Sequence, residues 1–206
     1  AKSDTAPAGR AVADRALGEL LQLSSRLGRH RRLEELLTEA AGRDVGGSAG
    51  EMVEQGKQAQ WLIRTHPDRA LLFGPSGLDR ILAFGSVHYQ PDPKIREFKA
   101  SPHGSTLVQM RDLAGSVGMP FQMAKRVDVQ SEITAPALVH WTVGHFAALL
   151  KAEGGRLLVE DPAFGPARWI SRKAFDEEAS GYALVSPGDL PAGWRSVPEA
   201  EGETEL

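Results

Sequence analysis

The fold of this chain is constrained most by one stretch, VHWTVGHFAALLKAEGGRLLVEDP, residues 139–162. It holds two apolar segments, residues 145–151 and 156–160, on either side of a Gly-Gly pair, which is the pattern of a β-hairpin. His145 opens the first segment and Asp161 follows the second. Because hairpin strands run antiparallel, these two residues come level at one end. An imidazole held there by a carboxylate has the geometry of two thirds of a catalytic triad.

Periodic patterns elsewhere predict helices in the first half of the chain and strands in the second. Helices are expected over residues 17–27, 33–40, 49–64, 73–84, 107–117 and 174–179, and strands over residues 121–127, 136–141, 145–151, 156–160 and 181–186. Gly28 is expected to end the first helix, Ser105 or Thr106 to cap the fifth, and Ser171 to cap the last. Helices followed by a largely antiparallel sheet make an α+β arrangement.

These patterns divide the chain into three parts. Residues 1–69 are predicted to form a helical extension, and residues 70–186 the main α+β domain. Within that domain, residues 88–105 are rich in Pro and polar side chains and are expected to be a loop. Residues 187–206 combine Pro, Gly and Glu, which favours a coil ending in a disordered acidic tail.

Composition argues against several classes of function. A net charge of −3 and a pI near 6.1 give no support to nucleic-acid binding, and the basic run RLGRHRR lies beside glutamates without interleaved aromatics. No apolar run approaches the roughly 18 residues of a membrane span, so no membrane insertion by this chain is expected. The start of the sequence lacks the apolar centre of a secretory signal.

No cofactor or metal is expected. His140 and His145 have no third ligand at a recognisable spacing, so neither is expected to bind a metal. The absence of cysteine removes disulfides, zinc-thiolate sites and thiol nucleophiles together. It leaves the compartment open, either the cytoplasm or the outside of the cell. The sequence does not begin with methionine, and we expect it to be a piece of a larger protein.

The order of four segments resembles one enzyme family. The segments are FGPSGLDRIL, LVQMRDLAGSVGM, PALVHWTVGHFAALL and LLVEDPAFG, followed by ISRKAFDEEASGYALV. Together they resemble the bacteriocin-processing cysteine peptidases, which are papain-like and cleave double-glycine leaders. The resemblance covers a little over half of the chain, from about residue 70 to residue 186. It implies a papain-like fold for this part.

The resemblance also assigns positions in the site. It places the catalytic histidine at His145 and the residue that orients it at Asp161. The family's nucleophilic cysteine stands immediately before the glycine that begins a helix, and that position here is Phe73. The oxyanion-stabilising glutamine lies a few residues upstream in the family, where this chain has THPDRALL. Thiol proteolysis by this chain is therefore excluded.

The resemblance further implies a substrate cleft around these positions. The residues that are candidates to line it are Gly74, His140, Trp141 and Gly144. Phe73 is expected to fill the space beside the imidazole by stacking on it. His145 and Asp161 can be interpreted in two ways, as a pair that still binds something or as a structural hydrogen bond that pins the hairpin.

Three functions fit the sequence. The first is a catalytically inactive peptidase-like domain that binds or docks a polypeptide segment, or another domain of its own protein or complex, as cysteine-less domains of this family in transporters are thought to do. The second is a structural or plug domain of a larger secreted repeat or toxin-like protein. The third is a hydrolase with non-thiol chemistry, for which Ser76, about one helical turn beyond Phe73, is the nearest hydroxyl.

Overall fold

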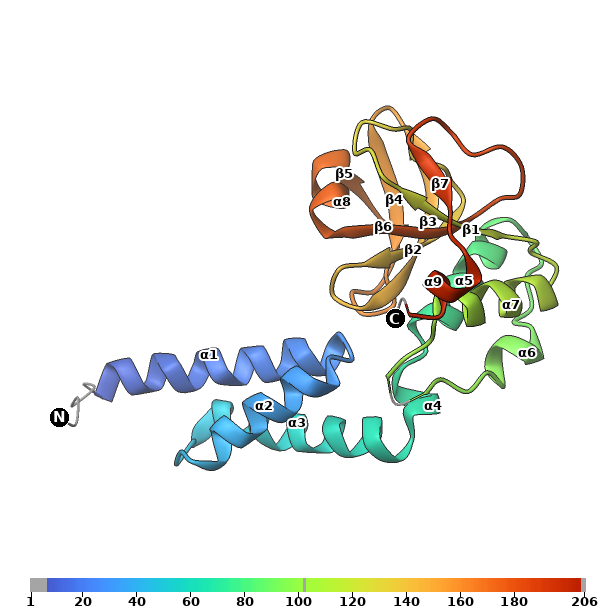
Figure 1. Ribbon diagram of the computed structural model, residues 1–206. Coiled ribbons are helices and arrows are strands. Elements are labelled where there is room, and N and C mark those ends of the chain that lie inside the picture. The colour runs from blue at the N-terminus through green and yellow to red at the C-terminus, as the bar shows by residue number, and fades with distance from the viewer. Residues whose placement is uncertain (1–6, 102, 205–206) are drawn as a thin grey trace. The chain divides into compact units, whose positions relative to one another are not determined.

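The computed structural model describes residues 7–101 and 103–204, and these divide into two compact units on either side of the Ala70–Leu71 bond (Figure 1). The first unit contains four helices, α1 (Pro7–Arg26), α2 (His30–Ala41), α3 (Gly47–Thr65) and α4 (Pro67–Ala70). No helix of the described residues combines the length and the apolar character needed to cross a bilayer.

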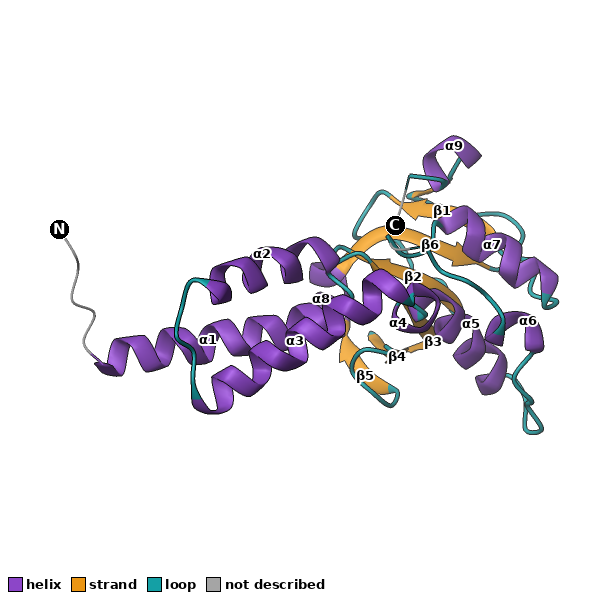
Figure 2. Ribbon diagram, turned by 90° about the horizontal axis from the view of Figure 1, so that it is seen from below, coloured by secondary structure: helices purple, strands orange, loops and turns teal. Residues whose placement is uncertain are grey.

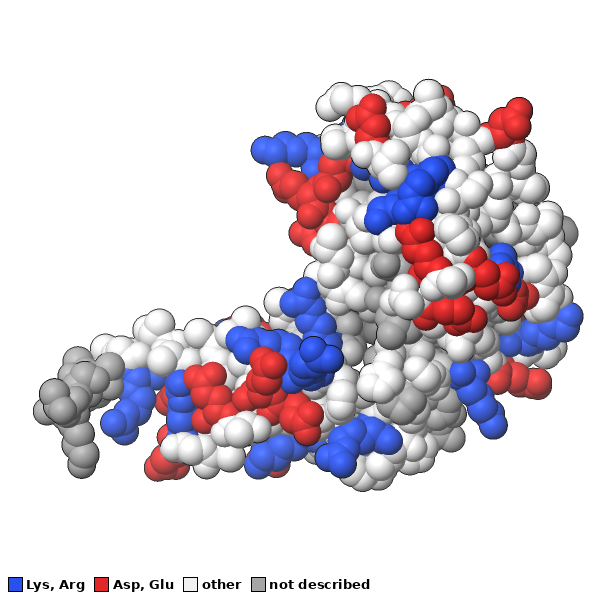
Figure 3. Space-filling view, in the orientation of Figure 1, with Lys and Arg blue, Asp and Glu red and all other residues white. Residues whose placement is uncertain are grey.

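The helical unit is held by leucines at helical spacing. Leu21, Leu33 and Leu36 are fully buried. Gly56 of α3 lets the helices approach, since a Cβ there would lie 3.4 Å from side-chain atoms of both Leu21 and Leu37. Gly28 follows α1 with φ +64, as expected for a residue that ends a helix. Basic and acidic side chains are interspersed on the face of this unit seen in Figure 3, which is a mixed surface and not a cationic patch.

The second unit is a seven-stranded sheet with helices on both faces. Its helices are α5 (Phe73–Phe84), α6 (Pro93–Arg96), α7 (Leu107–Ser116), α8 (Arg172–Glu178) and α9 (Glu199–Gly202). Its strands are β1 (Gln122–Arg126), β2 (Ala137–Trp141), β3 (His145–Glu153), β4 (Arg156–Glu160), β5 (Arg168–Ser171), β6 (Ala179–Val185) and β7 (Trp194–Ser196). The strand order is β5-β4-β3-β2-β6-β1-β7, and all neighbouring strands are antiparallel. The predicted α+β class is confirmed.

Each face of the sheet has its own core. On one face, α5, α6 and α7 bury Leu78, Ile95 and Met110 against strand residues such as Leu138. Figure 2 shows these three helices grouped together beside the sheet. On the other face, Phe175 of α8 packs among the small and branched side chains that alternate with the first set along the strands.

Local sequence signals position these elements as predicted. Thr106 caps α7 in a capping box with Gln109, and Ser171 caps α8 through the Ala174 N–H. The hairpin of β3 and β4 closes through Gly154 and Gly155, both at positive φ, because a two-residue turn of this kind needs left-handed backbone at both positions.

The structure corrects three expectations. The predicted loop over residues 88–105 contains α6, where the Asp92 side chain caps the Lys94 N–H and Ile95 is buried. The short edge strand β5 was not predicted, since most of its residues are exposed and give no apolar pattern. The predicted terminal coil and disordered tail instead contains β7 and α9, because Val197 and Gly202 find buried positions against the second unit.

Candidate functional site

The hairpin end brings together the two residues that its spacing singles out. His145 opens β3 and is paired across the ladder with Trp141, the last residue of β2. Asp161 follows β4 directly. The Nε2 atom of His145 lies 2.9 Å from Oδ2 of Asp161, and the His145 side chain is 1% exposed. The predicted contact between the two residues is therefore present in the structure.

Asp161 is fixed by two further donors. The Nε1–H of Trp141 donates to the same oxygen, Oδ2, at 2.8 Å. The backbone N–H of Ala163 donates to the other oxygen, Oδ1, at 2.8 Å. Burial raises the pKa of the Asp161 carboxyl, but the hydrogen bonds from His145, Ala163 and Trp141 outweigh that effect and leave the pKa below its ordinary value. The group is thus a carboxylate at neutral pH.

This arrangement sets the proton positions on the imidazole. An ionised carboxylate only accepts hydrogen bonds, so Nε2 of His145 carries a proton and donates it to Asp161. In the neutral imidazole, Nδ1 is then left with a lone pair. Nδ1 is buried and has no hydrogen-bond partner among the described residues. A histidine oriented in this way is prepared to accept a proton from a nucleophile.

Phe73 stands against this imidazole. It is the first residue of α5, directly before Gly74, and its ring centroid lies 4.8 Å from that of His145, with 39° between the planes. This distance falls in the range of favourable aromatic contacts. The side chain offers no proton to Nδ1 and no atom able to attack a carbonyl.

The other proposed cleft residues separate into different environments. Gly74 is buried, and a Cβ on it would lie 2.2 Å from Sδ of Met110. His140 is 5% exposed, its Nδ1 lies 3.0 Å from the Ser180 hydroxyl, and its ring packs 5.0 Å from Phe146. Since neighbouring strand residues point to opposite faces, His140 lies on the face away from Trp141. Gly144 is exposed in the turn between β2 and β3, at φ +86.

Neither a serine nucleophile nor a metal site is assembled among the described residues. Ser76 lies in the first turn of α5 with its backbone N–H bonded to Leu72. Because Nε2 of His145 is bonded to Asp161 and Nδ1 has no partner, the Ser76 hydroxyl is not hydrogen bonded to this imidazole. In the described part of the chain, no group of three or more His, Asp or Glu side chains could hold a metal ion.

The role of Trp141 in this cluster was not predicted from the sequence. Trp141 was expected to line the cleft or the core, but its indole N–H is a hydrogen-bond donor to Asp161. Trp141 is the cross-strand neighbour of His145, and this position follows from the pairing of β2 with β3. Buried tryptophan usually finds an acceptor for its N–H, and that signal points to the nearby carboxylate.

The sequence model of the Peptidase C39 family matches residues 74–188, more than half of the chain. The chain belongs to the Peptidase C39 family. The match begins at the glycine after Phe73 and ends just beyond β6, so it contains His145, Asp161 and the strands that place them. The resemblance to bacteriocin-processing peptidases, and with it the papain-like α+β fold, is confirmed.

Two curated relatives are transporters of Escherichia coli. Colicin V secretion/processing ATP-binding protein CvaB is 33% identical to this Peptidase C39 member over 95 residues, which are 45% of this chain and 14% of that protein. Probable microcin-H47 secretion/processing ATP-binding protein MchF is 30% identical over 95 residues, with the same coverage. The chain thus matches a small part of the length of these relatives.

Solved structures of similar domains are also found. One is a double glycine motif protease from an AMS/PCAT transporter, in complex with the leader peptide, at 24% identity and a TM-score of 0.48, covering 57% of this chain and 84% of that one. Another is the N-terminal peptidase C39 like domain of the toxin secretion ATP-binding protein from Vibrio parahaemolyticus, at 12% identity and a TM-score of 0.42, covering 60% and 96%.

Proposed function

We propose that this Peptidase C39 domain binds a polypeptide segment without hydrolysing it. The observation that carries the proposal is the contact between Phe73 and His145, because the family resemblance assigns the nucleophile to position 73. The chain has no cysteine that could act from another position. The His145–Asp161 pair is then the base half of a peptidase site that has no nucleophile to activate.

Loss of the nucleophile does not remove the means of binding a peptide. Extended peptides are held mainly by main-chain hydrogen bonds and side-chain pockets, and these contacts do not involve the attacking atom. Two hydrogen bonds to Asp161 and the ring contact of Phe73 fix the positions of the side chains at this end of the sheet. A rigid surface loses little conformational entropy when it binds a partner.

A leader peptide with a double-glycine motif is the probe that tests both halves of the proposal. Titration calorimetry is expected to show saturable binding, and mass spectrometry of the same mixture is expected to show the peptide intact. A scrambled peptide of equal composition serves as the control. A cleaved peptide would contradict the loss of catalysis. No binding to a folded domain would contradict the docking role and favour the structural or plug alternative.

Restoring the nucleophile tests the assignment of the positions. In a Phe73→Cys variant, the new thiol is expected beside the imidazole of His145, at the start of α5, and both lower the pKa of a thiol. At pH 6, this thiol is expected to react with iodoacetamide at least about tenfold faster than free cysteine does.

The control for this variant is the double substitution Phe73→Cys with His145→Ala, which keeps the thiol and removes the base. Its thiol is expected to react more slowly than that of the single variant, because only the start of α5 still lowers its pKa. If the single variant is no faster than free cysteine, Phe73 does not occupy the nucleophile position, and the proposed equivalence of Phe73, His145 and Asp161 is wrong.

A further inference from the structure

The end of the chain forms a structure that the family match does not include. The match to Peptidase C39 stops at residue 188. Residues 194–203, which we call the strap, contain β7, the buried Val197 and α9. The strap lies along β1 and α7, and every contact described below is within the second unit.

The first half of the strap extends the sheet by one short strand. Three residue pairs join β7 to β1, from Ala124 opposite Ser196 to Arg126 opposite Trp194. The Val197 N–H then donates to the Met123 carbonyl at 3.1 Å, and the Val197 side chain enters the core beneath α7. On its other side β1 pairs with β6, so the position of β1 does not depend on the strap.

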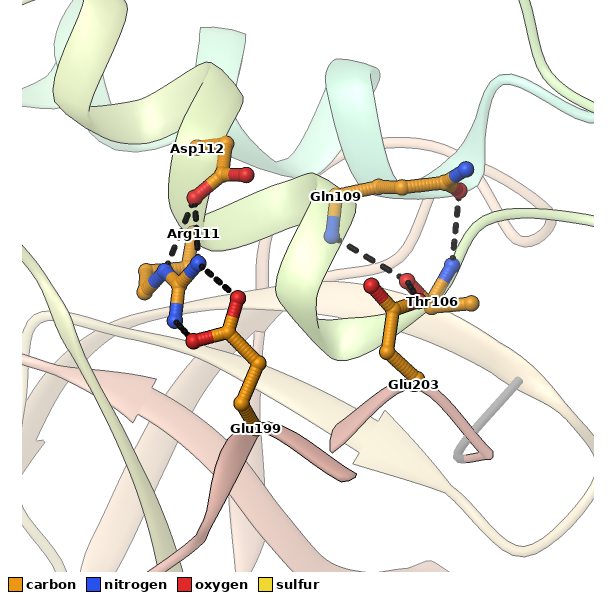
Figure 4. Close-up of polar contacts among 6 residues, drawn as sticks. All are labelled: Thr106, Gln109, Arg111, Asp112, Glu199 and Glu203. Carbon is orange, nitrogen blue, oxygen red and sulfur yellow. Dashed lines mark hydrogen bonds and ion pairs between the residues drawn. The ribbon is translucent and has the colours of Figure 1, made fainter. Parts of the chain in front are cut away.

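The second half of the strap places a carboxylate at every second residue. Figure 4 shows Glu199 directed at Arg111, with oxygen–nitrogen distances of 3.3 and 3.4 Å, and Glu203 directed at the Thr106 hydroxyl at 3.3 Å. Between them, Glu201 accepts from the Tyr182 hydroxyl at 2.7 Å. Hydrogen bonds from Arg195 and Tyr182 lower the pKa of Glu201 to about 2, so it is charged at neutral pH.

A glycine lets the strap reach an apolar floor. A Cβ built on Gly202 would lie 2.7 Å from Sδ of Met123 and 3.0 Å from Cγ2 of Val108. These floor residues are buried, and both belong to the core between α7 and the sheet. A larger residue at position 202 would therefore require either a shift of the Met123 and Val108 side chains or a displacement of α9 from the floor.

The contacts that hold the strap are individually weak. The Glu199 side chain is 68% exposed, and exposed ion pairs contribute little and are screened by salt. Three strand pairs and two buried residues add to them, together with single hydrogen bonds from the Val197 N–H to Met123, from Tyr182 to Glu201 and from the Trp194 indole to the Glu132 carbonyl. Without the strap, Val108 and Met123 would be uncovered, together with the edge of β1. Around them lie Arg111 with its partner Asp112, Lys125, and the hydroxyls of Thr106 and Tyr182.

We propose that this groove is a docking site for an acidic polypeptide segment of a partner, and that the strap occupies it in cis. The partner segment pairs with the edge of β1, places alternating carboxylates against Arg111 and Tyr182, and carries a glycine over Val108 and Met123. Charge complementarity selects this class of partner, because Arg111, Lys125 and the two hydroxyl donors outnumber Asp112, the carboxylate that shares Arg111 with Glu199. The groove shares no residue with Phe73, His145 and Asp161, so this inference stands apart from the proposed function.

Opening the groove in the full chain provides the test. A Gly202→Val variant is expected to displace α9, and a fluorescent peptide with the sequence of residues 194–203 is expected to bind it at least about tenfold more tightly than it binds the unaltered chain, since a tethered ligand competes at high effective concentration. Ala200→Val is the matched control, because residue 200 is exposed in the same helix. The same peptide carrying the Gly202→Val change is expected not to bind. Equal affinity for the variant and the unaltered chain, or no binding to a folded variant, would overturn the proposal.

Hydrogen exchange on the unaltered chain tests, without any substitution, whether the strap opens locally. Amides of β7 and α9 are expected to exchange by local opening, about tenfold or more faster than those of β3 at the centre of the sheet. Exchange of the strap only together with global unfolding would show that it is a fixed part of the core. A Phe73→Ala substitution is expected to leave peptide binding at the groove unchanged, which separates this result from the proposed function.

Discussion

Asp161 accepts hydrogen bonds from three donors at the hairpin end. These bonds stabilise its ionised form more in the folded chain than in the unfolded chain. Its pKa is lowered on folding, so its contribution to stability is fully present above the unfolded value of about 3.9 and is lost as the pH falls through the lower folded value. An Asp161→Asn variant is expected to lower the free energy of unfolding by about 1–3 kcal/mol at pH 7, because an amide satisfies these donors less well.

The pH dependence distinguishes a charge effect from a change of shape. Urea unfolding of the unaltered chain and of Asp161→Asn is expected to differ at pH 7 and to converge as the pH falls below the unfolded pKa of about 3.9 and on through the lower folded pKa of Asp161. The Glu97→Gln variant, at an exposed position of the same unit, controls for the general loss of a carboxylate. A difference that stayed constant over this range would contradict the assignment of the effect to the Asp161 charge.

Single residues of the site differ in how far the sequence determines them. His145 and Asp161 were predictable together, because a Gly-Gly turn between two apolar segments fixes which ends of the strands come level. Trp141 was not, because its N–H reaches Asp161 across a strand pairing that no local signal encodes. The stacking of Phe73 on His145 was expected from the family resemblance, and the ring contact is present in the structure.

Among the elements, α5 is the one whose packing depends most on a small residue. A Cβ on Gly77 would lie 2.4 Å from Cδ1 of Leu138, with the backbone of β3 next to it. Gly77→Ala is expected to lower the free energy of unfolding by about 1–3 kcal/mol, because the methyl group must displace the buried Leu138 side chain or shift the helix away from the sheet. Chemical denaturation followed by circular dichroism measures the change.

Gly115 of α7 is the matched control for that substitution. It too lies in a helix, but a Cβ there would have nothing within 4 Å. Gly115→Ala is expected to be neutral or to raise the free energy of unfolding by up to about 1 kcal/mol, because alanine has the higher helix propensity. If both variants lost the same stability, close packing of α5 on the sheet would not explain the result at Gly77.

Elements with strong local signals were predictable, and those held by distant contacts were not. The helix α7 has a capping box and an apolar face, and the hairpin of β3 and β4 has its Gly-Gly turn. In contrast, β5 is a four-residue edge strand, and the strap is ordered by Met123 and Val108, which lie far from it in sequence. Composition alone could not reveal these partners, since its glutamates and glycine equally fit a solvated coil.

At the scale of the whole molecule, the second unit builds both of its buried clusters from its own residues. One buried cluster runs from Leu78 to Val197 and the other from Ala124 to Val185, and neither includes a residue of the helical unit. A set of buried side chains that is complete in this way is what allows a domain to fold alone. The helical unit has a separate set around Leu21 and Leu33.

A chain shortened to begin at Leu71 is therefore expected to fold. Its denaturant unfolding should remain a single cooperative transition, with a free energy of unfolding within about 1 kcal/mol of that transition in the full chain. Because Val197 and Gly202 belong to this unit, a fragment that also lacks the strap is the informative comparison, and it is expected to be less stable while keeping the sheet. Loss of cooperative unfolding in the fragment that begins at Leu71 would mean that the helical unit supplies part of the core, contrary to the closure of the two clusters.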